Sequence, residues 1–167
     1  MHDRLTRGDI EKMEKEIEHR KLVVRKECIE AVKEARAHGD LSENFEYHAA
    51  KRDKNKNESR IRYLERMIKT AEIVEDVSTD ETVGMNNSVT VYIEDEGEEE
   101  TYKIVTTIRA DSLAGKISIE SPLGKALLGH KVGDRVTVEV NPSVCYDVVI
   151  RSIDKSTDEE EDAISKF

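Results

Sequence analysis

Two long segments with helical periodicity, separated by a short polar turn, constrain the fold of this chain more than any other feature. Apolar residues recur at intervals of three, four and seven positions from Ile10 to Ala35, and again from Tyr47 to Ala71. Such spacing is typical of the seam of a coiled coil. The turn begins at Gly39, near the midpoint of the two segments, and glycine can adopt the left-handed conformation that ends a helix. The pattern predicts an antiparallel helical hairpin.

The two segments also match each other in an antiparallel register in which facing positions sum to about 81. In this register Ile17 is expected to face Leu64, and Val24 is expected to face Asn57. Thr6 precedes the first segment as a candidate N-cap, with a carboxylate at the third helical position. The first helix is therefore expected to begin directly after Thr6.

The composition argues against one large globular core and against a membrane protein. Of the 167 residues, 37% are hydrophobic and 4% aromatic, whereas 38% are charged, so we expect an elongated part and a small compact part. No window approaches about 18 consecutive apolar residues, and the N-terminus lacks the apolar stretch of a signal peptide. Cys28 and Cys145 lie too far apart for a CxxC pair and are expected to be reduced thiols. We expect a cytoplasmic protein with no membrane partner.

The net charge of −10 is unevenly distributed along the chain. Residues 1–75 carry 18 Lys/Arg against 17 Asp/Glu, net +1, and residues 76–167 carry 9 against 20, net −11. The phosphates of duplex DNA repel an acidic chain, so no specific duplex DNA readout is expected. Within 51–69, however, eight Lys/Arg stand against three Asp/Glu, net +5, and this basic run follows directly after the turn.

From about residue 76 the periodicity changes to the alternation typical of β-strands. Pro122 and Gly129 bracket a short helix among these strands. The candidate strands are 88–93, 101–105, 116–119, 135–140 and 144–150. The sequence therefore predicts an α+β fold in three parts: a coiled-coil hairpin over 1–75 with its acidic tip at 39–44, a small antiparallel β-sheet domain with one short helix over 76–153, and a mobile acidic tail over 154–167.

The turn carries two carboxylates, Asp40 and Glu43, which have two interpretations. In the first, Asp40 is the N-cap of the second helix and Glu43 reaches back to a backbone N–H, a purely structural arrangement. In the second, the two carboxylates bind Mg²⁺, a hard cation that prefers oxygen ligands. Two carboxylates are too few for a tight site of the chain's own, but they would complete a site whose other ligands come from a partner.

Two sequence signatures resemble those of the Gre family of bacterial transcript cleavage factors. The first spans residues 35–51, ARAHGDLSENFEYHAAK, and resembles the tip signature of the family. The second is SPLGKALLG at residues 121–129, followed by Gly133-Asp134. The resemblance covers about residues 5–153 and is closer to the A type than to the B type, because the basic run after the tip is moderate.

The resemblance implies an accessory factor, not an enzyme. In this family the coiled coil enters the secondary channel of bacterial RNA polymerase that has backtracked and extruded the nascent RNA 3′ end. The polymerase then cuts its own transcript, and arrested transcription resumes. Asp40 and Glu43 match the family's acidic pair, which helps to hold a Mg²⁺ ion shared with the polymerase active site and positions the attacking water. No tightly bound cofactor of the chain's own is expected.

The resemblance also implies contacts with RNA or the channel. The candidate contact residues are Ser42, Asn44, Tyr47, Arg36, Lys51 and Arg52. For the three basic residues in this set, a position on a solvated helix face is an equally good interpretation. The second domain would have an FKBP-like fold and dock on the rim of the channel, without prolyl isomerase activity. We expect the chain to act as a monomer.

Phe45 departs from the small residue typical of its position in the family. It could pack against Leu41 and stiffen the tip, or contact RNA bases or the channel wall. Two alternatives to a cleavage factor remain: a homologue that occupies the channel and inhibits the polymerase, and a coiled-coil adaptor whose tip acids are only caps. The Asp-Leu-Ser-Glu spacing argues against the inhibitory homologue, because such relatives carry a more densely acidic tip.

Overall fold

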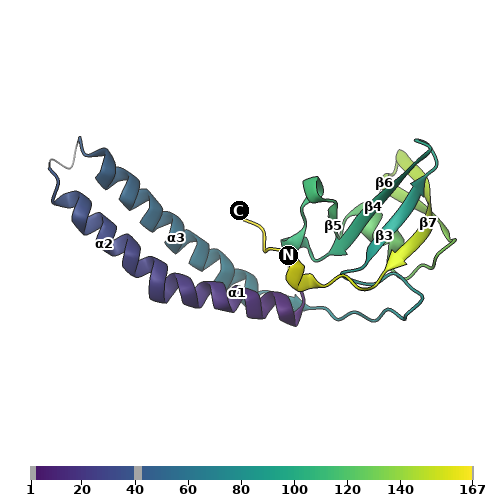
Figure 1. Cartoon of the computed structure of the whole chain (residues 1–167), viewed down its shortest axis with the longest axis horizontal. Helices are drawn as coiled ribbons and strands as arrows, with labels where there is room; N and C mark the ends of the chain where they lie inside the picture. The colour runs from purple at the N-terminus through teal and green to yellow at the C-terminus, as the bar shows by residue number, and fades with distance from the viewer. Residues whose placement is uncertain (1–2, 40–42, 167) are drawn as a thin grey trace. The chain divides into compact units, whose positions relative to one another are not determined.

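The structure is a computed structural model that describes residues 3–39 and 43–166 (Figure 1). The chain divides into two compact units. One unit contains Asp9–Ala71 and is a helical hairpin, and the other contains Arg4–Gly8 and the chain from Glu72 onward. The second unit, the sheet unit, is therefore assembled from segments on both sides of the hairpin. Among the described residues, no helix combines the length and the apolarity needed to cross a bilayer.

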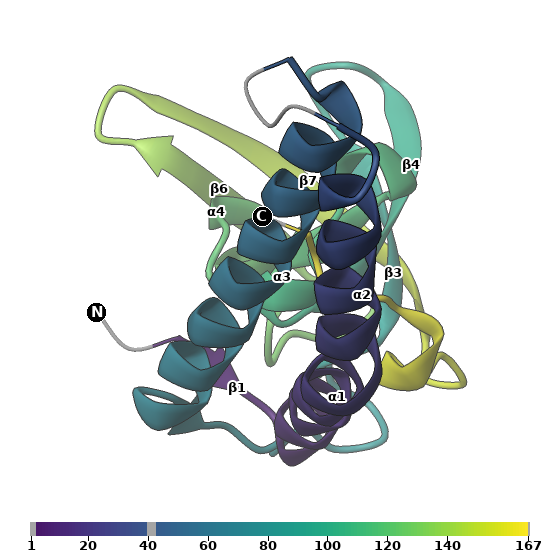
Figure 2. The ribbon, with the colours of Figure 1, turned by 90° about the vertical axis from the view of Figure 1, so that its left-hand side faces the viewer.

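The hairpin has two arms that lie side by side (Figures 1 and 2). The first arm comprises α1 (Arg7–His19), a π-helical segment (Arg20–Val24) and α2 (Arg25–Arg36). The second arm is α3 (Phe45–Lys69). Of the seam residues, Leu64 is fully buried, whereas Ile17 and Val24 are half-buried. The predicted helical hairpin is confirmed, and α1 begins directly after Thr6 as expected.

The π-helical segment was not predicted. A π turn contains more residues than an α turn, so it changes the phase of the seam within the first arm. Asn57 bonds to Arg20, with 3.0 Å between Arg20 Nη1 and Asn57 Oδ1 and 3.3 Å between Asn57 Nδ2 and the Arg20 carbonyl. The expected partner of Asn57 was Val24, four residues further along the arm.

The sheet unit contains a five-stranded sheet with the strand order β5-β4-β3-β7-β6 (Figure 1). Every strand overlaps one of the five predicted segments. Alternate residues of the central strand β3 are buried, and α4 (Pro122–Leu127) contributes Leu123 and Leu127 to the same core. The predicted α+β fold is confirmed. The strands are β3 (Ser88–Ile93), β4 (Glu98–Val105), β5 (Lys116–Ser118), β6 (Arg135–Asn141) and β7 (Val144–Asp154).

One pair of neighbouring strands departs from the predicted antiparallel sheet, because β4 and β5 are parallel. Parallel neighbours need a connection that carries the chain back to the edge where the first strand began. Here that connection contains two 3₁₀ turns, Thr107–Arg109 and Ser112–Ala114. Alternation of apolar residues locates a strand but does not give its direction, so the sequence pattern could not predict a mixed sheet.

Two short strands flank the hairpin. β1 (Arg4–Leu5) and β2 (Glu72–Ile73) pair in parallel, with Leu5 beside Ile73. Leu5 is fully buried, and its carbonyl accepts a hydrogen bond of 2.9 Å from the backbone N–H of Val74. The segments that lead into and out of the hairpin are therefore joined to each other within the sheet unit.

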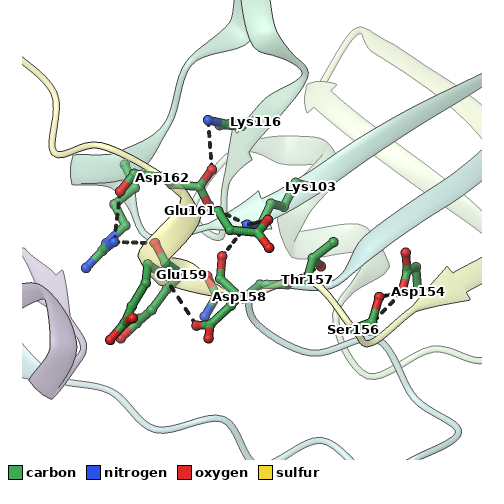
Figure 3. A network of polar contacts seen from close by, with 12 residues as sticks. Lys103, Lys116, Asp154, Ser156, Thr157, Asp158, Glu159, Glu161 and Asp162 are labelled. Atoms are coloured by element: carbon green, nitrogen blue, oxygen red, sulfur yellow. Dashed lines mark hydrogen bonds and ion pairs between the residues drawn. The ribbon is translucent and has the colours of Figure 1, made fainter.

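The segment after β7 differs from the predicted mobile tail. Residues 155–165, here called the C-terminal strap, contact the sheet unit through ion pairs and hydrogen bonds (Figure 3). Glu159–Glu161 form a 3₁₀ turn, and Asp162 is only 1% exposed. The run of acids from 158 to 162 indicated a solvated segment. The lysines that bind this segment lie on strands distant in the sequence, so the local sequence carried no sign of the contact.

Candidate functional site at the hairpin tip

The tip is built around Asn44, the N-cap of α3. Its Oδ1 accepts a hydrogen bond of 3.0 Å from the backbone N–H of Tyr47, which satisfies one of the unpaired donors at the start of the helix. Its Nδ2 donates a hydrogen bond of 2.5 Å to the carbonyl of Ala35 in α2. A single side chain therefore caps the second arm and ties it to the first.

The position of this cap excludes one of the two interpretations of Asp40. Because α3 begins at Phe45 and its N-cap is Asn44, the interpretation of Asp40 as the cap of the second helix is wrong. Asp40 and Ser42 lie outside the described residues, and the roles predicted for them stay predictions. Glu43 directly precedes the N-cap and is exposed. Its carboxylate therefore faces solvent at the end of the hairpin.

Below the tip, Tyr47 packs with Val32, Ala35 and Ala50 in a small apolar cluster. Tyr47 is 9% exposed, and the guanidinium carbon of Arg36 lies 5.6 Å from the centre of its ring, a cation–π distance. The hydrogen bond with Arg36 also holds the pKa of Tyr47 below its ordinary value. These contacts give Tyr47 and Arg36 a role in orienting the tip, and a contact of either with RNA stays a prediction.

His38 and Glu46 form a second link across the tip, which the sequence analysis missed. His38 Nδ1 lies 3.0 Å from Glu46 Oε2. The hydrogen bond to Glu46 and the charge of that carboxylate raise the pKa of His38 above its ordinary value. Gly39 follows with φ of +143°, a conformation that favours glycine. Helical periodicity carries no signal for a contact across a turn, so this pair could not be found from spacing.

Three further candidate contact residues lie along the start of α3. Phe45 is 87% exposed, so most of its ring faces solvent in the described part of the hairpin. A packing contact with Leu41 falls outside the described residues. Lys51 and Arg52 are also exposed, about two turns beyond Phe45. Exposed aromatic and basic side chains suit contacts with bases and phosphates respectively, and these roles stay predictions.

The tip offers the donor chemistry that Mg²⁺ prefers. Carboxylate oxygens are its usual protein ligands, and the ion keeps several waters that a partner can replace. Over residues 3–39 and 43–166, no group of three or more His, Cys, Asp or Glu side chains is arranged to hold a metal ion. The exposed Glu43 carboxylate fits a ligand set that a partner completes, and Asp40 is the second ligand that the sequence predicts.

A buried polar layer joins the two arms in the shaft of the hairpin. Arg60 is 6% exposed and donates to Glu16 through Nε at 2.8 Å and Nη2 at 3.3 Å. Arg20 donates to the same carboxylate at 2.8 Å, and Asn57 bonds to Arg20 in turn. Polar residues within a seam specify the register of a coiled coil. The only sequence signal for this layer was that Asn57, a polar residue, falls at a seam position.

Comparison with known proteins assigns both units to one family. Residues 4–73 match the N-terminal domain of transcription elongation factors, and residues 78–155 match the C-terminal domain of the transcription elongation factors GreA and GreB. The transcription elongation factor GreA of Geobacillus kaustophilus is 50% identical over 136 residues, which cover 81% of this chain and 86% of the relative. GreA of Streptococcus sanguinis is 47% identical over 153 residues, covering 91% and 95% respectively.

Among solved structures, GreA factor homolog 1 of Thermus thermophilus is 28% identical, with a TM-score of 0.42 over 92% of this chain and 99% of that one. The two family matches together span most of the chain. The chain therefore belongs to the GreA/GreB family of transcription elongation factors, and its relatives place it with the GreA type. The family and type predicted from the two signatures are confirmed.

Proposed function

We propose that this elongation factor stimulates endonucleolytic cleavage of the nascent RNA 3′ end in backtracked RNA polymerase and so rescues arrested transcription. The hairpin enters the secondary channel of the polymerase and brings the tip acids to the active site. The factor is not itself a nuclease, because it activates a cleavage that the polymerase carries out. The tip signature and the GreA-type relatives support this proposal.

The position of Glu43 is the observation that carries the proposal. Its carboxylate is exposed at the end of the hairpin, and the cap of α3 is supplied by the neighbouring Asn44 instead. The α3 arm has 25 residues, which at 1.5 Å each makes it about 38 Å long. Because Asn44 and Tyr47 hold the start of this arm against α2, the carboxylate is carried on a preorganised support.

In the cleavage reaction, Glu43 and Asp40 would contribute carboxylate ligands to the shared Mg²⁺ ion. When bound, such an ion lowers the pKa of a coordinated water and stabilises the charge that develops on the phosphate. A Glu43 oxygen would also accept a hydrogen bond from the attacking water and orient it. Lys51 and Arg52, exposed on α3, would bind phosphates of the extruded RNA.

The test is RNA cleavage in a purified, artificially backtracked RNA polymerase complex in Mg²⁺ buffer. The wild-type factor should release short 3′ fragments rapidly. The double variant Asp40→Ala/Glu43→Ala should lose this activity while its affinity for the polymerase stays near that of the wild type. Glu30→Ala, which removes an exposed carboxylate from α2, is the matched control and should cleave normally.

The possible outcomes separate the three interpretations. Normal cleavage with the double variant would show that the tip acids are not metal ligands. If the wild-type factor slows elongation without cleavage, it is an inhibitor that occupies the channel. If it affects neither elongation nor cleavage and does not bind the polymerase, the hairpin is an adaptor whose function lies elsewhere.

A further inference from the structure

The C-terminal strap binds to the sheet unit through a carboxylate held between two lysines. Asp162 Oδ2 lies 2.6 Å from Lys103 Nζ on β4, and Asp162 Oδ1 lies 2.7 Å from Lys116 Nζ on β5 (Figure 3). The Asp162 side chain is 1% exposed and that of Lys103 is 10% exposed. Burial of an acid to this degree requires compensation by nearby cations, which both lysines supply.

The two lysines are neighbours because of the strand register. Lys103 pairs with Lys116 across the parallel strands β4 and β5, so their ammonium groups lie on the same side of the sheet. Like charges directly opposite each other destabilise a sheet. A carboxylate placed between them removes this repulsion. The sheet surface is therefore arranged to accept one acidic side chain at this position.

The same surface also recognises the main chain of the strap. Arg109, 2% exposed, donates through Nη1 to the carbonyl of Asp162 at 2.9 Å and also to the carbonyl of Glu159. Lys103 Nζ donates to the carbonyl of Asp158. The backbone N–H of Ser165 donates to the carbonyl of Ile108 at 2.7 Å. Hydrogen bonds to backbone groups, combined with a specific side-chain contact, are typical of peptide recognition.

One aliphatic side chain of the strap is also buried. Ile164, two residues after Asp162, is 9% exposed although it lies in a short segment close to the C-terminus. Apart from Thr6, which donates to Glu159, the residues of the sheet unit that bind the strap lie within the stretch that matches the GreA/GreB C-terminal domain, residues 78–155, whereas the strap from residue 156 onward lies beyond that stretch. The binding surface thus belongs to the shared domain, and its occupant lies outside the matched region.

We propose that Lys103, Arg109 and Lys116 form a binding site for acidic peptides in which an Asp stands two residues before an aliphatic residue, and that the C-terminal strap is its intramolecular ligand. The strap follows β7 without a long linker, so its effective concentration at the site is of millimolar order. An acidic segment of a partner protein gains access only when the strap is released. The strap is therefore an autoinhibitory occupant of a partner site.

The test uses the full-length chain and a labelled synthetic peptide of residues 155–166, with binding followed by fluorescence anisotropy. Asp162→Asn in the chain should open the site, so this variant should bind the peptide about tenfold or more tightly than the wild-type chain does. A peptide that carries Asn in place of Asp162 should bind the variant much more weakly. Glu160→Gln, which removes an exposed acid from the same segment, is the control for net charge and should leave the site closed.

A folded Asp162→Asn chain that fails to bind the peptide would overturn the proposal. Equal binding of the Asp and Asn peptides would also overturn it, because attraction would then follow net charge alone. If the variant does not fold, hydrogen exchange of the wild-type chain tests the proposal instead. The Ser165 amide should be protected, and the wild-type peptide in excess should speed its exchange while the Asn peptide does not. A Ser165 amide that exchanges freely, or one that neither peptide affects, would refute the proposal.

Discussion

Removal of the Glu16 carboxylate should destabilise the hairpin far more than removal of an exposed acid. Glu16 accepts three hydrogen bonds from two arginines: one from Arg20 at 2.8 Å and two from Arg60 at 2.8 and 3.3 Å. In Glu16→Ala all three are lost, and Arg60 remains 6% exposed with its charge uncompensated by this partner.

The magnitude follows from the burial of each partner. Loss of one partner from a fully buried ion pair costs about 3–5 kcal/mol. The side chains of Glu16 and Arg20 are 27% and 30% exposed, so Arg20 can turn into solvent in the variant. Only the charge of Arg60 then stays buried after its Glu16 partner is removed. We therefore expect Glu16→Ala to lower the free energy of unfolding of the hairpin by about 2–3 kcal/mol.

Urea unfolding followed by far-ultraviolet circular dichroism measures this change, because the hairpin contains most of the helix. Glu65→Ala is the matched control. The Lys21–Glu65 pair is 2.6 Å long, but its side chains are 43% and 46% exposed, and such pairs contribute about 0–1 kcal/mol. If the two variants lose the same stability within about 0.5 kcal/mol, burial of Arg60 does not determine the cost and the reasoning fails.

The Glu16 carboxylate should also make the stability of the hairpin depend on pH in the acidic range. Burial raises the pKa of Glu16, but the hydrogen bonds and charges of Arg60 and Arg20 outweigh it and hold the pKa below the ordinary value of 4.5. A depressed carboxyl pKa contributes stability that is present above 4.5 and is lost as the pH falls through the folded-state pKa. Urea midpoints below pH 4.5 should therefore fall more steeply for the wild type than for Glu16→Ala.

Three further predictions concern the tip and the sheet unit. The pKa of His38, measured by NMR, should exceed 6.5 and should fall in Glu46→Gln; the pair stabilises the tip below pH 6.5 and loses this effect as the pH rises through the folded-state pKa. Asn44→Ala should cost about 1–2 kcal/mol in urea unfolding, because both the cap of α3 and the bond to α2 are lost, and Asn44→Asp should cost less. Gly124→Ala should lower the calorimetric melting temperature of the sheet unit, because the new Cβ would lie 2.1 Å from the Ser118 carbonyl oxygen; an unchanged melting temperature would show that α4 shifts freely.

Much of the fold could be predicted from the sequence, because burial repeats along a helix or strand with a fixed period. The seam residues predicted both arms of the hairpin, and alternation predicted all five strands of the sheet. The parallel pairing of β5 with β4 could not be predicted in this way. Neither could the contact of Asp162 with Lys103 and Lys116, because it depends on which strands become neighbours and in which register.

The candidate site shows a different limit. Asp40-Leu41-Ser42-Glu43 has the residues of a capping arrangement, and Asn44 is also a good N-cap. Local preference alone does not choose between two acceptable caps four residues apart. The bond from Asn44 to α2 favours the later cap, and that bond exists only once the two arms are packed together. The choice therefore depends on tertiary structure, and with it the exposure of Glu43.

The pairing of β1 with β2 has a consequence for how this family can diversify. Because Leu5 lies beside Ile73, the hairpin is an insertion whose two ends return to one junction in the sheet unit. A duplication of seven residues in one arm would have to be matched in the other, or the junction would be pulled out of register. Evolution can thus lengthen, shorten or exchange the whole hairpin as a cassette, and we expect length differences among homologues to occur in matched pairs.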